Sequence, residues 1–294
     1  MTTAPAAVMR EVPRLRQWVA AQRAAGRRIG LVPTMGALHE GHLALVDALR
    51  PVTDRVVMSI FVNPLQFGPG EDLERYPRDL DRDRQLAGSR GVDLVFAPEV
   101  RTMYPPGAET RVVPGETAER WEGANRPGHF VGVLTVVAKL FHLVQPDVAA
   151  FGQKDVQQIT LIRRMVRDLD WPIELVVAPT VREPDCLAMS SRNQYLDPAE
   201  RQQALGLSAA LRAAHQAWSA GERSAAAIER AMRERLEVFP GLVADYIAIT
   251  DPDHLRPVDT VDAATVVALA GRVGDTRLID NIILGDGLVG CSAT

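Results

Sequence analysis

Two histidines three residues apart are the first side chains in this sequence that could do chemistry. They are His39 and His42, in the segment PTMGALHEGHLALVDAL of residues 33–49. A predicted strand ends at Val32, a turn containing glycine follows, and a helix is predicted to begin near His42. The amides and positive dipole end of such a helix attract phosphate, and imidazoles can donate to phosphoryl oxygens. The segment therefore predicts a phosphate site. Helix capping and metal ligation are the alternatives, although no HExxH pattern or third ligand at zinc-like spacing accompanies the pair.

A lysine and an aspartate follow another predicted strand, in FGQKDVQQITLIRRMVRDL of residues 151–169. Gly152 closes the strand, and Lys154 and Asp155 begin the next helix, at the strand end where open α/β proteins bind ligands. Lysine is a point charge suited to phosphate, and aspartate can accept from a ribose hydroxyl. Of the 33 basic residues only this lysine and Lys139 are not arginine. A nucleotide site is predicted here, with a solvated Lys–Asp helix cap as the alternative.

Two further loops could complete such a site. LAMSSRN, residues 187–193, offers two hydroxyls and a guanidinium that can wrap a triphosphate. SIFVNPLQFGPGEDLERYPR, residues 59–78, ends a predicted strand at Asn63-Pro64 with Gln66 just beyond, which places neutral amides suited to a small hydroxy acid. Ordinary turns are the alternative for both loops. No GxxxxGKS/T, complete GxGxxG or GxSxG motif occurs.

Composition excludes several classes of protein. The chain has 294 residues, 47% of them apolar, with a net charge of −4 and a pI near 5.9. No basic stripe suggests a nucleic-acid partner, and no apolar run approaches the roughly 18 residues of a membrane span. The N-terminal stretch lacks the basic-then-apolar order of a signal peptide. Cys186 and Cys291 are too few for a disulfide framework or a four-thiolate metal site. We therefore expect a cytoplasmic protein.

Short apolar runs alternate with helical patterns through the first 180 residues. This alternation predicts a parallel sheet with helices on both faces. The predicted strands are Ile29–Pro33, Arg55–Val62, Val92–Ala97, Asp147–Phe151 and Ile173–Pro179. The predicted helices are Gly41–Arg50, Leu80–Gly88, Val131–Val144 and Val156–Asp168.

The pattern changes beyond Val181. A polar loop punctuated by prolines is followed by two helical stretches and then three β-like runs, an order that predicts a separate small α+β unit. We therefore divide the chain into domains 1–181 and 182–294. The helical stretches are Pro198–Ala220 and Ala225–Val238, and the β-like runs are Ala244–Thr250, Thr265–Ala270 and Leu278–Leu284.

Taken in order, these segments resemble the pantothenate synthetase (pantoate–β-alanine ligase) family, within the wider HxGH nucleotidyltransferase superfamily. The resemblance spans about residues 28–284. Its blocks are PTMGALHEGH, FVNPLQF, RPGHFVGVLTVVAKL, FGQKDVQQ, PTVREPDCLAMSSRNQYL and a late DNI. It implies an α/β fold, with a Rossmann-like doubly wound parallel sheet as the catalytic domain, a smaller C-terminal α+β lid domain, and a homodimer. It also implies the reaction: pantoate and ATP, with Mg²⁺, give pantoyl-adenylate and pyrophosphate, and β-alanine then displaces AMP.

The resemblance also implies roles for individual residues. His42 would donate a proton, His39 would contact phosphate and Lys154 would stabilise charge on the transferring phosphorus. Gln66 and Gln158 would hold pantoate, with Gln66 also bordering β-alanine. The implied ATP contacts are Met35, Gly36, Ala37, Leu38, His39, Glu40, Gly41, His42, Gly152, Gln153, Lys154, Asp155, Val181 (facing adenine by its backbone), Met189, Ser190, Ser191 and Arg192.

This sequence departs from the family pattern at two places. Cys186 replaces the glycine that usually precedes the LAMSSRN block, and arginines interrupt the acidic residues of RDLDRDRQLAG, residues 78–88. We therefore assign no protein ligand to the metal, which we expect ATP oxygens and water to bind. Three rival classes remain. Another HxGH nucleotidyltransferase would need no amine acceptor, and the pI and length disfavour an aminoacyl-tRNA synthetase. The third is a catalytically silent nucleotide sensor.

Overall fold

The computed structural model describes residues 5–291. The first four residues of the N-terminal stretch, for which we expected no signal peptide, lie outside the described residues. The chain separates into two compact units. The first unit comprises residues up to 119, 123–152 and 161–178. The second unit comprises residues 120–122, 153–160 and 179 onward.

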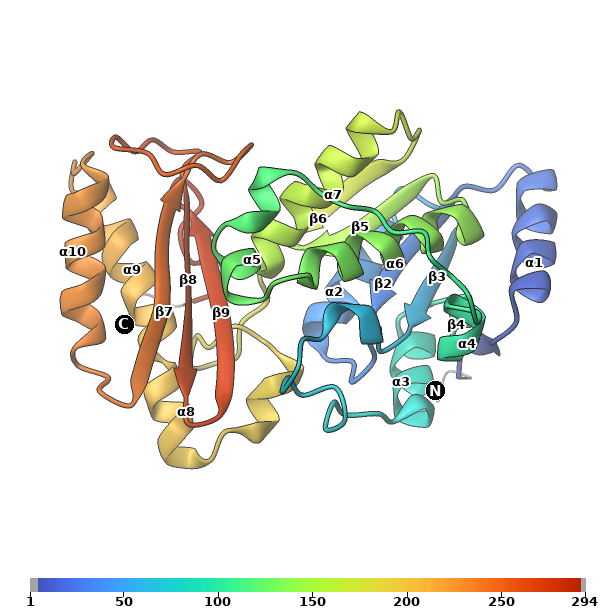
Figure 1. Cartoon of the computed structure of the whole chain (residues 1–294), viewed down its shortest axis with the longest axis horizontal. Coiled ribbons are helices and arrows are strands. Elements are labelled where there is room, and N and C mark those ends of the chain that lie inside the picture. Colours follow the sequence, from blue (N-terminus) through green and yellow to red (C-terminus); the bar gives the residue numbers. More distant parts are fainter. Residues whose placement is uncertain (1–4, 292–294) are drawn as a thin grey trace. The chain divides into compact units, whose positions relative to one another are not determined.

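The first unit is built on a sheet of six strands, all parallel, in the order β1-β4-β3-β2-β5-β6 (Figure 1). The strands are β1 (Ala7–Met9), β2 (Ile29–Thr34), β3 (Arg55–Ile60), β4 (Leu94–Phe96), β5 (Val148–Gly152) and β6 (Glu174–Ala178). The helices are α1 (Val12–Ala24), α2 (Glu40–Leu49), α3 (Leu80–Ser89), α4 (Val100–Met103), α6 (His129–Val144) and the greater part of α7 (Val156–Asp168). The strand order reverses between β2 and β5, which is the topological switch point where such sheets bind ligands.

Alternate residues of these strands face opposite layers of helices, as the two-residue period of a strand requires. Val32 and Ala150 pack in one buried cluster with Val46 of α2 and with α3. Phe151, the next residue along β5, instead contacts the ring of Phe141 on α6. The sheet is therefore covered on both faces, which confirms the predicted fold class.

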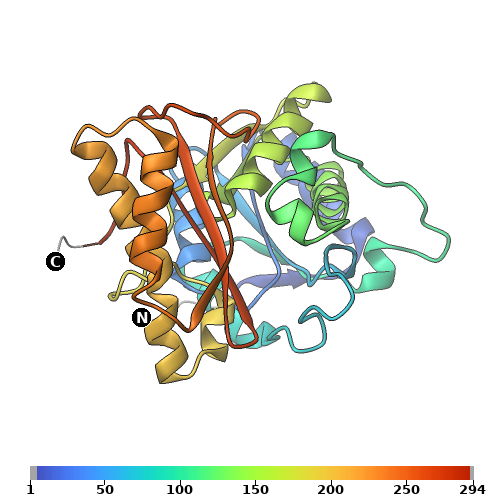
Figure 2. The same ribbon diagram turned by 60° about the vertical axis from the view of Figure 1, so that its left-hand side comes forward.

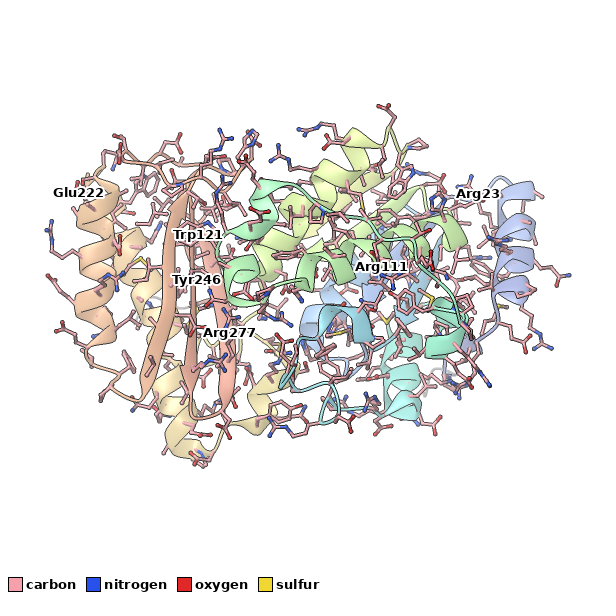
Figure 3. The ribbon with its side chains drawn as sticks, viewed as in Figure 1. Arg23, Arg111, Trp121, Glu222, Tyr246 and Arg277 are labelled. Carbon is pink, nitrogen blue, oxygen red and sulfur yellow. A yellow bond between two sulfur atoms is a disulfide. The ribbon has the colours of Figure 1, made fainter. Side chains whose placement is uncertain are left out.

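The second unit contains an antiparallel sheet in the order β7-β8-β9 with helices on one face (Figure 2). Its elements are α8 (Pro198–Ala204), α9 (Gly206–Ser219), α10 (Ala225–Leu236), β7 (Leu242–Thr250), β8 (Val266–Val273) and β9 (Thr276–Ile283). On the other face, Trp121 packs against Tyr246 (Figure 3). Arg277 pairs with Glu122 at 2.6 Å. Tyr246 also donates to Glu122, so the short segment 120–122 is bound tightly to this sheet.

Some elements differ from the sequence prediction. The single helix expected over Pro198–Ala220 is two helices, α8 and α9, separated only by Leu205. A Cβ on Gly206 would lie 2.9 Å from the ring of Phe239, so the chain packs closely at this break. The structure also contains β1, α1 and the single-turn helices α4 and α5 (Glu122–Asn125), which the apolar pattern did not predict. The predicted α+β character of the second unit is confirmed.

Candidate functional site

The two histidines stand at the beginning of α2, directly after the loop that leaves β2. His39 is the N-cap, and its Nδ1 accepts from the amide of Gly41 at 3.1 Å. The Nδ1 of His42 accepts from the amide of His39 at 3.4 Å, and the two rings lie 4.1 Å apart. Because both Nδ1 atoms accept, each neutral ring carries its proton on Nε2. Capping thus fixes the tautomer of each neutral imidazole.

The loop before these histidines is held by Asp83 of α3. Its Oδ2 accepts from the amide of Ala37 at 2.9 Å and its Oδ1 from that of Leu38 at 2.8 Å. Burial raises the pKa of Asp83, while the two amides and Arg82 oppose that rise. Gly36 has a φ of +88°, and a Cβ there would lie 2.9 Å from Asp83 Oδ2. A glycine is therefore required at this turn both for its backbone conformation and for the space.

Gln66 lies close to this loop within the first unit. Its Nε2 donates to the sulfur of Met35 at 3.1 Å, and its Oε1 accepts from Asn63 Nδ2 at 3.0 Å. Asn63 is in turn oriented by the hydroxyl of Tyr104, which donates to its Oδ1 at 2.9 Å. The structure therefore brings together two predicted site residues, Met35 and Gln66, and fixes which end of the Gln66 amide faces which partner.

The backbone of the Gln66 turn is anchored from the beginning of α6. The carbonyl of Gln66 accepts from His129 Nδ1 at 2.7 Å and from Arg126 Nη2 at 3.3 Å. Arg126 also pairs with Glu71 at 2.6 Å. Burial alone would raise the pKa of Glu71, but its hydrogen bond to Arg126 and the charge of that guanidinium lower it. These contacts give the RPGHF block, which had no role in our sequence analysis, a structural one: its Arg126 and His129 hold the backbone of the Gln66 turn.

Lys154 belongs to the second unit, in the single 3-10 turn Gln153–Asp155 that follows β5. Asn281 of β9 donates from Nδ2 to the carbonyl of Gln153 at 3.0 Å and to that of Lys154 at 2.8 Å. Asp155 is exposed, and Gln158 is partly exposed on α7. The neighbouring Gln157 is buried and bonds the segment 120–122 instead. Sequence reasoning missed Asn281, although the late DNI block contains it.

The serine-rich loop is a hairpin closed by backbone bonds. The amide of Met189 donates to the carbonyl of Val181 at 2.9 Å, and Arg182 forms an isolated bridge with Ala188. Ser190 caps the turn Ser191–Tyr195, because its Oγ accepts from the amide of Arg192 at 3.2 Å. The structure thus places Val181 beside Met189 and orders the predicted triphosphate loop.

Asp280 of β9 secures the base of this hairpin. Arg182 donates to Asp280 through both Nη atoms, at 2.6 and 2.9 Å, and both side chains are almost fully buried. Nη1 of Arg182 also reaches the carbonyl of Cys186 at 3.2 Å. The ion pair therefore fixes the strand end from which the hairpin projects.

Cys186 has a φ of +70°, the left-handed conformation that glycine adopts readily, at the position where the family pattern has glycine. Its sulfur is joined to that of Cys291 in a disulfide, with the Cα atoms 5.6 Å apart. The sequence excluded a disulfide framework but did not predict this single bond. It attaches the C-terminal segment to the hairpin.

Residues 5–291 contain no group of three or more His, Cys, Asp or Glu side chains arranged to hold a metal ion. In the same part of the chain, no helix is both long and apolar enough to cross a membrane.

A histidine-capped loop follows β2 and a lysine turn follows β5, the two strands between which the strand order reverses, and this arrangement is typical of nucleotide-dependent enzymes. Comparison with known proteins specifies which one. A family model described as pantoate-beta-alanine ligase matches residues 7–283. The chain belongs to the pantoate–β-alanine ligase family, a family of ligases in pantothenate biosynthesis, as the sequence blocks predicted.

Individual relatives agree over nearly the whole chain. The pantothenate synthetase of Moorella thermoacetica is 55% identical over 94% of this chain and 98% of its own length. The crystal structure of the pantothenate synthetase from Thermus thermophilus is similar with a TM-score of 0.89 and 51% identity, covering 95% of this chain and 99% of that one. A ligase from Francisella tularensis, solved with β,γ-ATP and β-alanine, matches with a TM-score of 0.77 and 31% identity over 96% and 99% of the two chains.

Proposed function

We propose that this chain condenses (R)-pantoate with β-alanine in two steps, using ATP. The pantoate carboxylate attacks the α-phosphorus of ATP, so that a carboxyl oxygen–phosphorus bond forms and pyrophosphate leaves. The amine of β-alanine then attacks the acyl carbon of pantoyl-adenylate, the amide forms and AMP leaves. A free carboxylate is a poor acyl donor because its leaving group would be oxide, whereas AMP leaves readily if the mixed anhydride is kept from water. The observation that supports this function most is family membership together with the histidine-capped helix after β2.

In the first unit, the loop Met35–His42 would supply amides and imidazoles to ATP. His42 would donate the proton through Nε2 and His39 would contact phosphate, consistent with the capping bonds that occupy both Nδ1 atoms. Gln66 would hold the pantoate hydroxyl or carboxylate and border β-alanine. The fixed orientation of its amide supports this role, since a specific hydrogen bond needs a known donor and acceptor.

In the second unit, Lys154 would stabilise the charge that develops on the transferring phosphorus. Gly152, Gln153 and Asp155 would contact the ribose and phosphates beside it, and Gln158 would contribute to pantoate binding. Val181 would meet adenine through its backbone. Met189, Ser190, Ser191 and Arg192 would close over the triphosphate, with domain 182–294 acting as a lid over domain 1–181.

We further propose Mg²⁺ as the metal that accompanies ATP. Asp83 is a buried carboxylate that already accepts hydrogen bonds from two backbone amides of the loop Met35–His42, which leaves it poorly suited as a ligand of the metal. ATP oxygens and water would therefore supply most of the coordination, as is usual for magnesium. A homodimer and a cytoplasmic location complete the proposal, and light scattering of the purified protein tests the dimer.

Isotope exchange tests the two-step reaction. Labelled pyrophosphate should enter ATP when pantoate and Mg²⁺ are present and β-alanine is absent. After full turnover, oxygen-18 from the pantoate carboxylate should appear in AMP. Exchange that requires β-alanine would indicate a concerted route, and label in phosphate would indicate an acyl-phosphate. Turnover without any amine would favour a different HxGH nucleotidyltransferase.

Substitution tests the residue roles in the same exchange assay. Lys154→Ala should slow exchange by roughly two to three orders of magnitude, the usual loss when one electrostatic donor to a transition state is removed. Lys154→Arg should not restore it, because a planar guanidinium is broader than an ammonium. His42→Ala should depress exchange and overall synthesis together. Near-normal exchange in Lys154→Arg would refute the proposed role of the lysine.

A further inference from the structure

We infer that Asn281 is a positioning residue for the first half-reaction and acts by fixing the direction of the Lys154 side chain. The inference rests on the proposed role of Lys154. Asn281 touches the backbone of the turn and no reacting atom is assigned to it. Its two hydrogen bonds to consecutive carbonyls are the observation from which the role follows.

The geometry of those bonds is specific to one residue of the turn. The carbonyl of Gln153 lies in the peptide plane that precedes the Cα of Lys154, and the carbonyl of Lys154 lies in the plane that follows it. Peptide planes are rigid, so only φ and ψ of Lys154 remain between them. One side-chain amide that holds both carbonyls therefore fixes both angles, and with them the direction in which the Cβ of Lys154 leaves the backbone.

The turn is short and joins β5 directly to α7. Gln153–Asp155 is a single 3-10 turn, and such turns have poorer hydrogen-bond geometry than an α-helix. Asn281 is itself anchored: its own backbone amide donates to Asp280 Oδ1 at 2.8 Å, and the residue pairs with Ala268 in the β8–β9 ladder. A rigid strand thus holds a short turn through one amide group.

The side chain of Asn281 is a buried amide beside apolar neighbours. Asn281 is only 1% exposed, and its ladder neighbour Ala268 belongs to a small apolar cluster with Val156 and Trp121. Burying an amide in such surroundings is unfavourable unless its hydrogen bonds are made. The bonds that compensate here go to the lysine turn, which is why we assign the residue a role in the reaction.

A double-mutant cycle on pyrophosphate exchange tests the inference. Asn281→Ala should slow exchange about 10- to 100-fold, since a misplacement of about 1 Å costs up to about 100-fold, with little change in the apparent affinity for pantoate. In the Lys154→Ala background the same substitution should cause no further loss. A loss of the same factor in both backgrounds would show that Asn281 does not act through the lysine, and would overturn the inference.

Two further variants separate positioning from folding. Asn281→Ser keeps one donor and should retain more exchange than Asn281→Ala at similar melting temperatures. Gln157→Ala is the matched control, because this buried amide also makes two bonds of 2.9–3.0 Å in the same unit but to segment 120–122. We expect its effect on exchange to be additive with Lys154→Ala. If the control is as non-additive as Asn281→Ala, the inference fails.

The two proposals fail differently. If Lys154→Ala retains wild-type exchange, the proposed role of the lysine is wrong and the role of Asn281 falls with it. If Lys154→Ala abolishes exchange but Asn281→Ala, folded by its melting curve, exchanges at the wild-type rate, only the inference about Asn281 is refuted.

Discussion

Replacing Asp280 with asparagine should destabilise the second unit more than any exposed carboxylate substitution. The carboxylate accepts both Nη atoms of Arg182, at 2.6 and 2.9 Å, and the exposed fractions of the two side chains are 2% for arginine and 1% for aspartate. Asparagine has nearly the same shape but removes the negative charge and turns one acceptor into a donor. The buried guanidinium would then face an NH₂ group and lose its counter-charge.

The expected magnitude follows from the burial. Breaking a buried ion pair by removing one partner costs about 3–5 kcal/mol, because the other charge remains unpaired in a poorly solvated place. In domains of about 150–250 residues each kcal/mol lowers the melting temperature by roughly 2–4 °C, and in smaller ones by more, so a fall of at least about 6 °C is expected. The loss should appear as a shift in the urea midpoint without a change in slope if the native state stays compact.

The matched control is Asp47→Asn. Asp47 pairs with Arg90 at 3.2 Å, but the side chain of Asp47 is 51% exposed and that of Arg90 35%. Exposed pairs contribute about 0–1 kcal/mol, so the control should melt within a few degrees of the wild type. Urea and thermal unfolding of both variants measure the difference in stability between them. Equal stability of Asp280→Asn and Asp47→Asn would refute the reasoning, because burial would then carry no extra cost.

Three other outcomes are expected. Tyr104→Phe should raise the KM for pantoate several-fold and leave the KM for ATP unchanged, because the Tyr104 hydroxyl orients Asn63, which in turn orients the Gln66 amide. Burial raises the pKa of Tyr104 to about 12, so in the wild type this hydroxyl should keep donating across neutral and mildly alkaline pH. Glu71 has a lowered pKa in the folded protein, so its contribution to stability is complete above its unfolded pKa near 4.5 and is lost as the pH falls through the lower folded pKa. Unfolding curves from pH 3 to 7 should show this loss of stability, and Glu71→Gln should reduce the dependence of stability on pH. Reducing the bond between Cys186 and Cys291, 105 residues apart, should lower stability by up to about 4.7 kcal/mol, with no effect of reductant on Cys186→Ala as the control.

Much of the fold could be predicted because strands and helices are encoded by local patterns. The five strands predicted in the first 180 residues all form, since each is a short apolar run between turn residues. The helix after His39 was predicted to begin near His42 and begins at Glu40, because the strand-to-helix turn is encoded in adjacent residues. By contrast, β1 was not predicted: its three residues are followed at once by Arg10 and Glu11, whereas the equally short β4 lies within the mostly apolar run Val92–Ala97.

The contacts that support the site were harder to predict because they join residues far apart in the chain. Asp83 holds the amide of Leu38, 45 residues away, and Asn281 holds the carbonyl of Lys154, 127 residues away. In the sequence both look like ordinary polar residues of a helix or strand. A buried polar side chain reveals its purpose only when its partner is visible, since nothing local distinguishes a bonded amide from a solvated one.

The DNI block shows how one strand can serve two separate segments of the same unit. Successive side chains of a strand point to opposite faces, so Asp280 and Asn281 necessarily face different neighbours. Asp280 holds Arg182 at the base of the hairpin that leads to Met189, and Asn281 holds the turn that carries Lys154. Both segments are proposed to contact ATP phosphates, and both are fixed to adjacent residues of one hydrogen-bonded strand. A change of register in β9 by one residue would exchange the two faces and release both segments together.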